Sequence, residues 1–311
     1  MLFIGPTQLS GIGQHTLKYL ELFPNSVYKQ IHELGDDDDG QDTFIFPLPI
    51  EPWLSAIPKI KEKAKSLICM TTCETETVHE DYGKLFDMFD NIAVSSEFCK
   101  RVFSNQFPDT NFNIIRAHIP PPPVFILPES ARYRFYHIGN VLDQRKNVND
   151  ILRAFTELNL PQCELIIKAT CKQEVNIQHP NIKIINGLAP QEFIDRLHTM
   201  CDCYVSFSSS EGIGLGAVEA ALRDKPVILP EYGGAPDYIK SDYMISCGTQ
   251  EVPNDDFLFK KGMLWGKPNF EQLKEFMLDA HAKRVRKVDH SFTKMRVSKE
   301  EILAQFKAFP R

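Results

Sequence analysis

The sequence predicts an α/β protein built on parallel β-sheets, and two observations support this prediction. Short apolar segments typical of strands alternate along the chain with stretches of helical periodicity, as in parallel sheets joined by crossover helices. The length of 311 residues is sufficient for two domains of ordinary size. Four consecutive prolines at 120–123 cannot lie inside a sheet, so we expect a stiff extended link there and a domain boundary near residue 128.

The overall composition excludes several classes of protein. The hydrophobic fraction of 43% is typical of a soluble globular protein, and a net charge of −6 argues against a nucleic-acid-binding surface. No apolar run reaches the length of a membrane span, and the N-terminus does not read as a secretory signal. The eight cysteines lack the spacing of a zinc site and suit reduced thiols, so we expect a cytoplasmic protein without a structural metal.

The chain begins with a predicted strand at 2–4, a turn-rich loop and a helix at 14–22. The loop contains Gly11 and Gly13 in a G-x-G pattern, but Thr16 occupies the last glycine position of a dinucleotide fingerprint. Taken alone, these glycines fit a tight strand-to-helix turn as well as they fit a phosphate-binding loop.

An acidic run at 35–42 follows, and its like charges predict a mobile, solvated surface loop rather than a calcium site. A strand at 67–72, a helix at 82–90 and a strand at 92–94 come next. Glu74 lies just after the first of these two strands.

In the second half, we expect a strand at 135–138, a loop at 139–147 and a helix at 148–158. The strand at 164–169 contains Lys168, which would be costly to bury without a partner and therefore either ends the strand or reaches outward. Further strands and helices are predicted at 181–186 (strand), 190–200 (helix) and 269–284 (helix).

The most informative stretch runs from residue 203 to residue 228. It reads as a strand at 203–207, a loop of small residues at 208–216, a helix at 217–223 and a second strand. A loop that leads from the carboxyl end of a strand into a helix is where open α/β sheets bind ligands. Three glycines leave room for a phosphate at the helix N-terminus: Gly212, Gly214 and Gly216.

Two carboxylates bracket this loop, Glu211 and Glu219, with seven residues between them. Each could accept hydrogen bonds from the hydroxyls of a ligand. A lone pair of this spacing is more often a solvated loop residue and a favourable acid near a helix N-terminus. The interleaved glycines and the strand–loop–helix setting shift the balance toward a ligand site.

The segment SSSEGIGLGAVEAALRDKPVI resembles the donor-site signature of the retaining GT-B glycosyltransferases of family 4, with E-G-(F/I)-G-L and a second glutamate. Ile213 stands where the family usually has Phe, and Gly216 where it usually has Pro. Two further segments carry the resemblance. GNVLDQRKN at 139–147 is similar to the family's G-x-(L/V)-x-x-x-K-(G/N), and 90–100 fits D-x-I-x-V-x-S-E-F-x-K.

The resemblance implies a GT-B fold, with two Rossmann-like domains facing a central cleft. Residues 1–128 would form the acceptor-side domain and residues 129–290 the donor-binding domain, with 291–311 packing back on the first. The implied reaction transfers a sugar from a UDP- or GDP-linked donor to an acceptor hydroxyl, on a glycan, with retention of anomeric configuration. It implies no cofactor and no divalent metal.

The same resemblance assigns roles to individual residues. Arg145 and Lys146 would stabilise the leaving diphosphate, since negative charge develops there, although two solvated residues before a helix would look the same. Glu211 would hold sugar hydroxyls, Glu219 the ribose, and Glu74 is the carboxylate on the N-domain side of the cleft. The other donor-binding candidates are Gly13, Lys168, Gly212, Ile213, Gly214 and Leu215.

Two other functions remain compatible with the sequence. A GT-B-like protein that binds nucleotide sugars without transferring them would keep the same signature. A non-hydrolysing sugar-nucleotide epimerase would use the same fold, with acidic and basic side chains in the cleft and no acceptor.

Overall fold

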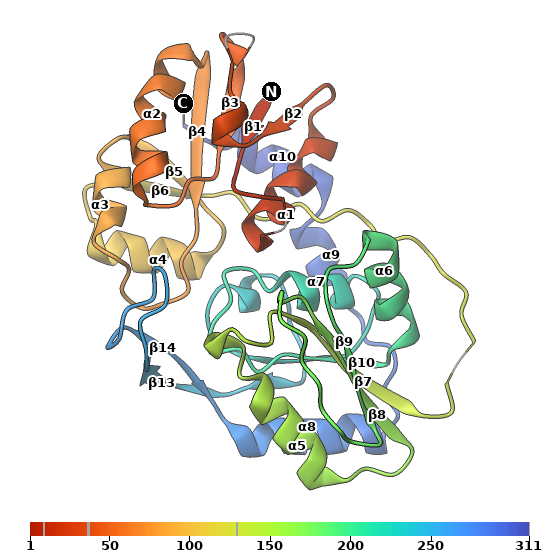
Figure 1. The fold of residues 1–311 in the computed structure, drawn as a ribbon. Helices are drawn as coiled ribbons and strands as arrows, with labels where there is room; N and C mark the ends of the chain where they lie inside the picture. The colour runs from red at the N-terminus through yellow and green to blue at the C-terminus, as the bar shows by residue number, and fades with distance from the viewer. Residues whose placement is uncertain (9, 36–37, 129, 311) are drawn as a thin grey trace. The chain divides into compact units, whose positions relative to one another are not determined.

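The computed structural model describes the chain except residues 9, 36–37, 129 and 311, and its described part forms two compact units (Figure 1). Unit 1 comprises Met1–Pro120, Glu251–Leu264 and Met295–Arg311. Unit 2 comprises Pro121–Gln250 and Trp265–Lys294. Each unit contains a six-stranded sheet whose strands pair in parallel, so the predicted α/β class with parallel sheets is confirmed.

Unit 1 has the strand order β2-β1-β3-β4-β5-β6, which changes direction at β1 and β3. Its strands are β1 (Leu2–Ile4), β2 (Val27–Lys29), β3 (Asp42–Ile45), β4 (Ser66–Thr71), β5 (Asn91–Val94) and β6 (Asn111–Ile114). Its helices are α1 (Gly11–Lys18), α2 (Glu51–Lys63), α3 (Asp81–Phe86), α4 (Glu97–Gln106) and α10 (Lys299–Ala308), with short 3-10 turns η1 (Tyr19–Leu22) and η2 (Ile31–Glu33).

Helix α10, near the end of the chain, belongs to the core of unit 1. Phe306 packs edge-on against Tyr19, with ring centroids 5.4 Å apart, and tilted against Phe44 at 5.7 Å. The side chain of Gln305 accepts a 2.7 Å hydrogen bond from the backbone of Arg116. Apolar burial and a long-range hydrogen bond therefore hold the last helix to the first sheet.

The first helix begins earlier than the sequence predicted. α1 starts at Gly11 rather than at residue 14, because the Ser10 side chain accepts a 3.0 Å hydrogen bond from the backbone of Gly13 and caps the helix. A Cβ on Gly13 would collide with the backbone oxygen of Thr7. Close packing of the turn thus explains this glycine without a ligand.

The acidic run at 35–42 differs from the predicted solvated loop in two respects, while 36–37 lie outside the described residues. Asp38 is only 9% exposed and its carboxylate lies 2.8 Å from Lys29 Nζ. Hydrogen bonds from Gly35 and Lys29 lower the pKa of Asp38, although burial alone would raise it. Asp42 opens strand β3. Local charge density did not reveal these partners, because Lys29 comes from a separate strand.

Unit 2 has the strand order β12-β11-β10-β7-β8-β9. Its strands are β7 (Tyr133–Gly139), β8 (Cys163–Ala169), β9 (Ile182–Ile185), β10 (Cys203–Val205), β11 (Val227–Pro230) and β12 (Met244–Ile245). In order along the chain these are strands 1 to 6 of a 3-2-1-4-5-6 sheet, the order of a dinucleotide-binding fold. The direction of winding reverses between β7 and β10, and open α/β sheets bind ligands at that switch point.

Helices cover both faces of the second sheet (Figure 1). They are α5 (Val148–Leu158), α6 (Gln191–Met200), α7 (Leu215–Ala221) and α8 (Phe270–Ala282), with short 3-10 turns η4 (Gln144–Lys146) and η5 (Ala235–Asp237). A two-stranded sheet that the sequence did not predict is formed by β13 (Cys247–Glu251) and β14 (Leu264–Pro268), and α9 (Ser291–Arg296) precedes α10. Among the helices that the structure describes, none is long and apolar enough to cross a membrane.

Candidate functional site

The loop between β10 and α7 is held in shape by residues from distant parts of unit 2. Ser209 donates its backbone N–H to the Arg145 carbonyl (2.7 Å) and accepts a backbone bond from Gly266 (2.9 Å). Its hydroxyl oxygen accepts from the side-chain amides of Asn147 (2.9 Å) and Gln250 (3.2 Å). Four partners on one residue leave this part of the loop little freedom, so the site is preorganised.

Glycines allow a second loop, after β11, to lie against the first. Gly233 has φ +77°, and a Cβ there would lie 2.7 Å from the Ser210 hydroxyl. Gly234 donates its N–H to the Glu211 carbonyl at 2.7 Å. Gly214 also has φ +77° and precedes the first residue of α7. Only glycine adopts these conformations at low cost, so both loops depend on it.

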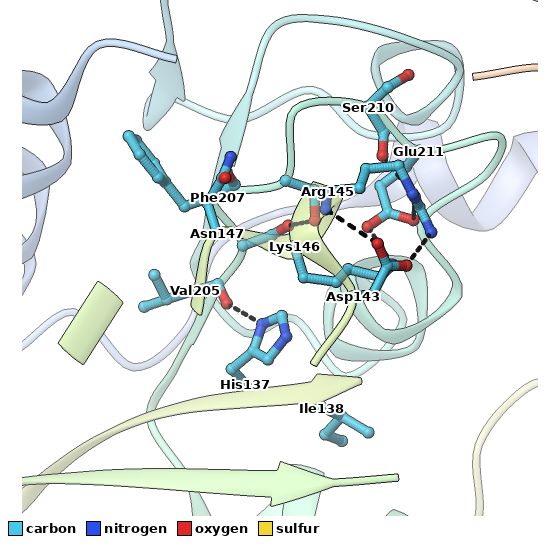
Figure 2. Close-up of polar contacts among 12 residues, drawn as sticks. His137, Ile138, Asp143, Arg145, Lys146, Asn147, Val205, Phe207, Ser210 and Glu211 are labelled. Carbon is cyan, nitrogen blue, oxygen red and sulfur yellow. Dashed lines mark hydrogen bonds and ion pairs between the residues drawn. The ribbon is translucent and has the colours of Figure 1, made fainter. Parts of the chain in front are cut away.

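A charged cluster lies where β7 and β10 end (Figure 2). Glu211 accepts from Lys146 Nζ at 2.6 Å through one carboxylate oxygen and from Arg145 Nη1 at 3.2 Å through the other. The Arg145 guanidinium also donates to the Ser210 carbonyl (2.6 Å) and to the Asp143 carboxylate (3.1 Å). The structure therefore brings Glu211 to Arg145 and Lys146, two predicted site residues that lie 66 and 65 positions away in the chain.

The three side chains of this cluster are mostly removed from solvent, with exposed fractions of 9% for Arg145, 16% for Lys146 and 17% for Glu211. Burial alone would raise the pKa of Glu211, but the charges of Lys146 and Arg145 lower it to about 2. The carboxylate is thus ionised at neutral pH and can only accept hydrogen bonds. Such a group is suited to binding hydroxyls of a ligand.

Glu219 lies in α7, and its side chain is 13% exposed. One of its carboxylate oxygens lies 3.4 Å from Nε2 of His198, a fully buried residue of α6. The Arg223 guanidinium donates to the backbone carbonyl of Glu219 at 2.8 Å. The sequence analysis identified Glu219 but not His198, since nothing in the local pattern of α6 distinguishes a histidine that faces a neighbouring helix.

Two other donor-binding candidates, Lys168 and Ile213, are both buried. Lys168 is 1% exposed, and its ammonium group donates to the carbonyls of Ala169 (3.2 Å) and Gly187. Burial lowers the pKa of Lys168. Ile213 is 8% exposed and anchors the loop through apolar burial.

The remaining loop residues place backbone groups at the start of α7. Gly212 precedes Ile213, and Leu215 is the first residue of the helix. Gly216, where the resembled family usually has Pro, faces Tyr204, and a Cβ at this position would lie 2.5 Å from the tyrosine hydroxyl. The glycine therefore makes room for a large aromatic residue of β10.

Two candidates belong to unit 1. Glu74 lies in the loop after β4, next to the buried Cys73, and is itself half-buried. Gly13 is buried in the first turn of α1 and donates its N–H to Ser10.

A further polar residue near the cluster was missed by the sequence analysis. His137 of β7 is 2% exposed and donates from Nδ1 to the Val205 carbonyl at 2.8 Å (Figure 2). Its Nε2 has no hydrogen-bond partner among the residues that the structure describes. Burial lowers the pKa of His137 to about 4, so the ring is neutral near pH 7.

A model of a known protein family matches a large part of unit 2. Residues 129–265 match the family model of glycosyl transferases group 1. This segment is therefore similar to a group 1 glycosyl transferase domain. The matched segment contains the strands from β7 to β13 and all three residues of the charged cluster, Arg145, Lys146 and Glu211. No curated protein matches the chain in sequence.

Solved structures resemble the whole chain in fold. The pneumococcal O-GlcNAc transferase GtfA, in complex with UDP and GlcNAc, has a TM-score of 0.58 at 15% identity, covering 95% of this chain and 59% of its own. A UDP-forming α,α-trehalose-phosphate synthase from Burkholderia vietnamiensis has a TM-score of 0.58 at 11% identity, covering 88% and 69%. The OtsA apo structure has a TM-score of 0.62 at 10% identity, covering 95% and 76%.

These likenesses confirm the predicted fold class, GT-B with two Rossmann-like α/β domains. The chain spans about three-fifths of the length of the first structures it matches, 59% in the case of the GtfA/B complex.

Proposed function

We propose that the protein is a retaining glycosyltransferase that moves a sugar from a nucleoside-diphosphate sugar to an acceptor hydroxyl on a glycan. The observation that carries the proposal is the cluster of Lys146 and Arg145 around Glu211 at the strand switch point of a group 1 domain. UDP is the first nucleotide to test, because the pneumococcal GtfA structure is a complex with UDP and the Burkholderia vietnamiensis synthase is UDP-forming.

The chemistry of these residues fits the cleavage of a sugar–diphosphate bond. As the bond between the anomeric carbon and the diphosphate oxygen breaks, negative charge develops on the leaving group. Lys146 and Arg145 would stabilise that charge in a largely buried site, where electrostatic interactions are stronger than in water. The new bond forms from the acceptor oxygen, whose proton leaves with the diphosphate.

The remaining residues would bind and orient the donor. Glu211, held ionised by its two cations, would accept hydrogen bonds from sugar hydroxyls, and Glu219 would accept them from the ribose. Backbone groups at 212–215 would contact the sugar and phosphates. Two cations already supply the positive charge that a divalent ion would provide, so we propose a metal-independent reaction. Glu74 is proposed as the cleft carboxylate of the N-terminal domain, Gly13 as a donor-binding residue and Lys168 as a secondary donor contact.

A binding experiment tests the donor site. Isothermal titration with UDP, GDP and ADP should give saturable binding of one of them. Lys146→Ala should weaken it at least about tenfold, because a hydrogen bond to a charged group contributes about 1.5–3 kcal/mol. The same substitution should weaken the binding of the matching nucleoside monophosphate by a smaller factor. Lys172→Ala, which removes an exposed lysine of the same unit, is the control.

The outcomes separate the proposal from its alternatives. Failure of all three nucleotides to bind, or equal binding by Lys146→Ala, contradicts the donor site. Binding of a sugar nucleotide with no release of its sugar, even with candidate acceptors, favours an inactive binding protein. Conversion of one sugar nucleotide into another without an acceptor favours an epimerase. Turnover that stops in EDTA and returns with a divalent ion contradicts the metal-independent mechanism.

A further inference from the structure

A chain of buried polar side chains ends at Glu219. His198 is fully buried in α6, with a hydrogen bond at Nδ1 and a longer electrostatic contact at Nε2. Its Nε2 lies 3.4 Å from a Glu219 carboxylate oxygen, and its Nδ1 lies 2.8 Å from the Tyr136 hydroxyl. Tyr136 is a buried residue of β7, so the chain links the central strand of the sheet, α6 and α7.

The direction of each hydrogen bond follows from the chemistry of its ends. A carboxylate only accepts, so His198 Nε2 carries the proton that faces Glu219. The other ring nitrogen then has a lone pair and accepts from the Tyr136 O–H. Burial lowers the pKa of His198 and raises that of Tyr136 well above its ordinary value, so both groups are neutral near pH 7. One tautomer of the imidazole therefore fits both contacts.

The imidazole is also held in place by two aromatic rings. Tyr204 stacks on His198 with ring centroids 6.2 Å apart, and Tyr136 packs edge-on at 5.4 Å. Tyr204 is in turn fixed by a 3.2 Å hydrogen bond from its hydroxyl to the Ile138 carbonyl. Gly216 leaves the space that this hydroxyl fills. The departure from Pro at 216 thus belongs to the same arrangement.

A separate ion pair fixes the helix that carries Glu219. Arg223 at the end of α7 pairs with Asp195 of α6 and donates to the Glu219 carbonyl. The position of the Glu219 backbone therefore does not depend on His198, so a substitution of His198 can act on the carboxylate without moving the helix.

We infer that His198 is a positioning residue, which holds the Glu219 carboxylate in the orientation that binds the two hydroxyls of a nucleotide ribose. The inference rests on the proposed function, in which Glu219 is the ribose ligand. His198 itself touches no substrate in this scheme. It acts by removing the rotational freedom of a carboxylate that would otherwise have to be ordered when the ligand binds.

The test compares a nucleotide with its analogue that lacks the two ribose hydroxyls. For whichever of UDP, GDP and ADP binds the unaltered protein, dissociation constants are measured for the ribonucleotide and for its 2′,3′-dideoxy form. His198→Leu should weaken the ribonucleotide about tenfold, equivalent to about 1.4 kcal/mol, and leave the dideoxy form unchanged. His198→Gln, whose amide N–H₂ can still donate toward Glu219, should keep most of the affinity.

Each other outcome overturns the inference. Equal losses for both ligands in His198→Leu indicate a general structural role, and no loss for either indicates that Glu219 does not need the histidine. Equal weakening in His198→Gln and His198→Leu shows that the N–H donor is not what matters. Glu219→Gln separates the two levels of the argument. If this variant prefers the ribonucleotide over the dideoxy form as strongly as the unaltered protein does, Glu219 is not the ribose ligand. The result then contradicts the proposed function, on which the inference about His198 rests.

Discussion

Replacing Glu211 with glutamine should destabilise unit 2 strongly at neutral pH and much less in acid. The change keeps the shape of the side chain but removes the charge between Lys146 and Arg145, whose nitrogens lie 2.6 and 3.2 Å from its oxygens. Lys146 would then lose this carboxylate, and Arg145 would keep that of Asp143. Loss of one partner from a buried pair costs about 3–5 kcal/mol, and the partial exposure here favours the lower end.

The pH dependence gives a second route to the same magnitude. The pKa of Glu211 is lowered from 4.5 to about 2 in the folded protein. A carboxyl group whose pKa is lower in the folded state stabilises the fold at any pH above its ordinary pKa. That stabilisation is lost as the pH falls toward the pKa of the folded state. At about 1.4 kcal/mol for each pKa unit, the contribution is about 3 kcal/mol at neutral pH, and less than half of it remains near pH 3.

The measurement can be confined to unit 2. The chain has two tryptophans, Trp53 in unit 1 and Trp265, which is 2% exposed, in unit 2. In a Trp53→Phe background, urea unfolding followed by the fluorescence of Trp265 reports on unit 2. Glu211→Gln is compared with the unaltered residue at neutral pH and near pH 3. Glu192→Gln, which removes an exposed partner of a helical ion pair, should cost at most about 0.5 kcal/mol.

The reasoning is refuted by either of two results. One is a loss of unfolding free energy in Glu211→Gln that is smaller than the loss in the surface-pair control Glu192→Gln, which would mean that the cluster is well solvated. The other is a cost that stays the same between neutral pH and pH 3, which would mean that the carboxylate pKa is not depressed in the folded state.

Three other predictions follow from separate features. Gly216→Ala should destabilise the protein by about 1–3 kcal/mol through overpacking against Tyr204, measured by thermal unfolding, and Tyr204→Phe in the same chain should recover part of the loss. Phe306→Ala should cost about 3–5 kcal/mol in urea unfolding followed through unit 1, with Phe306→Leu costing clearly less; equal costs would contradict packing as the cause. Burial alone would raise the pKa of the Cys99 thiol, but hydrogen bonds, first among them one from Cys73, lower it to about 6. Thiolate ultraviolet absorbance should therefore titrate near that pH and be absent from Cys99→Ser, and an unchanged titration would contradict the assignment.

Elements with strong local signals were predictable from the sequence. The helix predicted at 148–158 coincides with α5, and the strand–loop–helix pattern after residue 203 corresponds to β10, its loop and α7. Glycines, a run of good helix formers and a return to apolar residues are properties of neighbouring positions, so a short window reveals them. The boundaries moved by a few residues where a side chain such as that of Ser10 capped a helix.

Features that depend on distant partners were not predictable. β13 reads CGTQE and has no apolar alternation, so no strand was expected there. The partners of Ser209 come from 145–147, 250 and 266, and the chain from Tyr136 through His198 to Glu219 joins three separate elements. The sequence indicated candidate residues on the loop between β10 and α7, whereas only the fold shows the contacts that hold this loop.

The division of unit 1 among three segments of the chain has a consequence for its synthesis. The core of unit 2 uses residues between Tyr133 and Ala280, whereas the core of unit 1 joins Phe3 and Phe44 to Phe306 and Phe309. A chain growing on the ribosome can complete the second core before the first, although it starts the first core earlier. Until α10 emerges, the nascent first sheet lacks its apolar cover, which makes it the part of the newborn chain most in need of a chaperone.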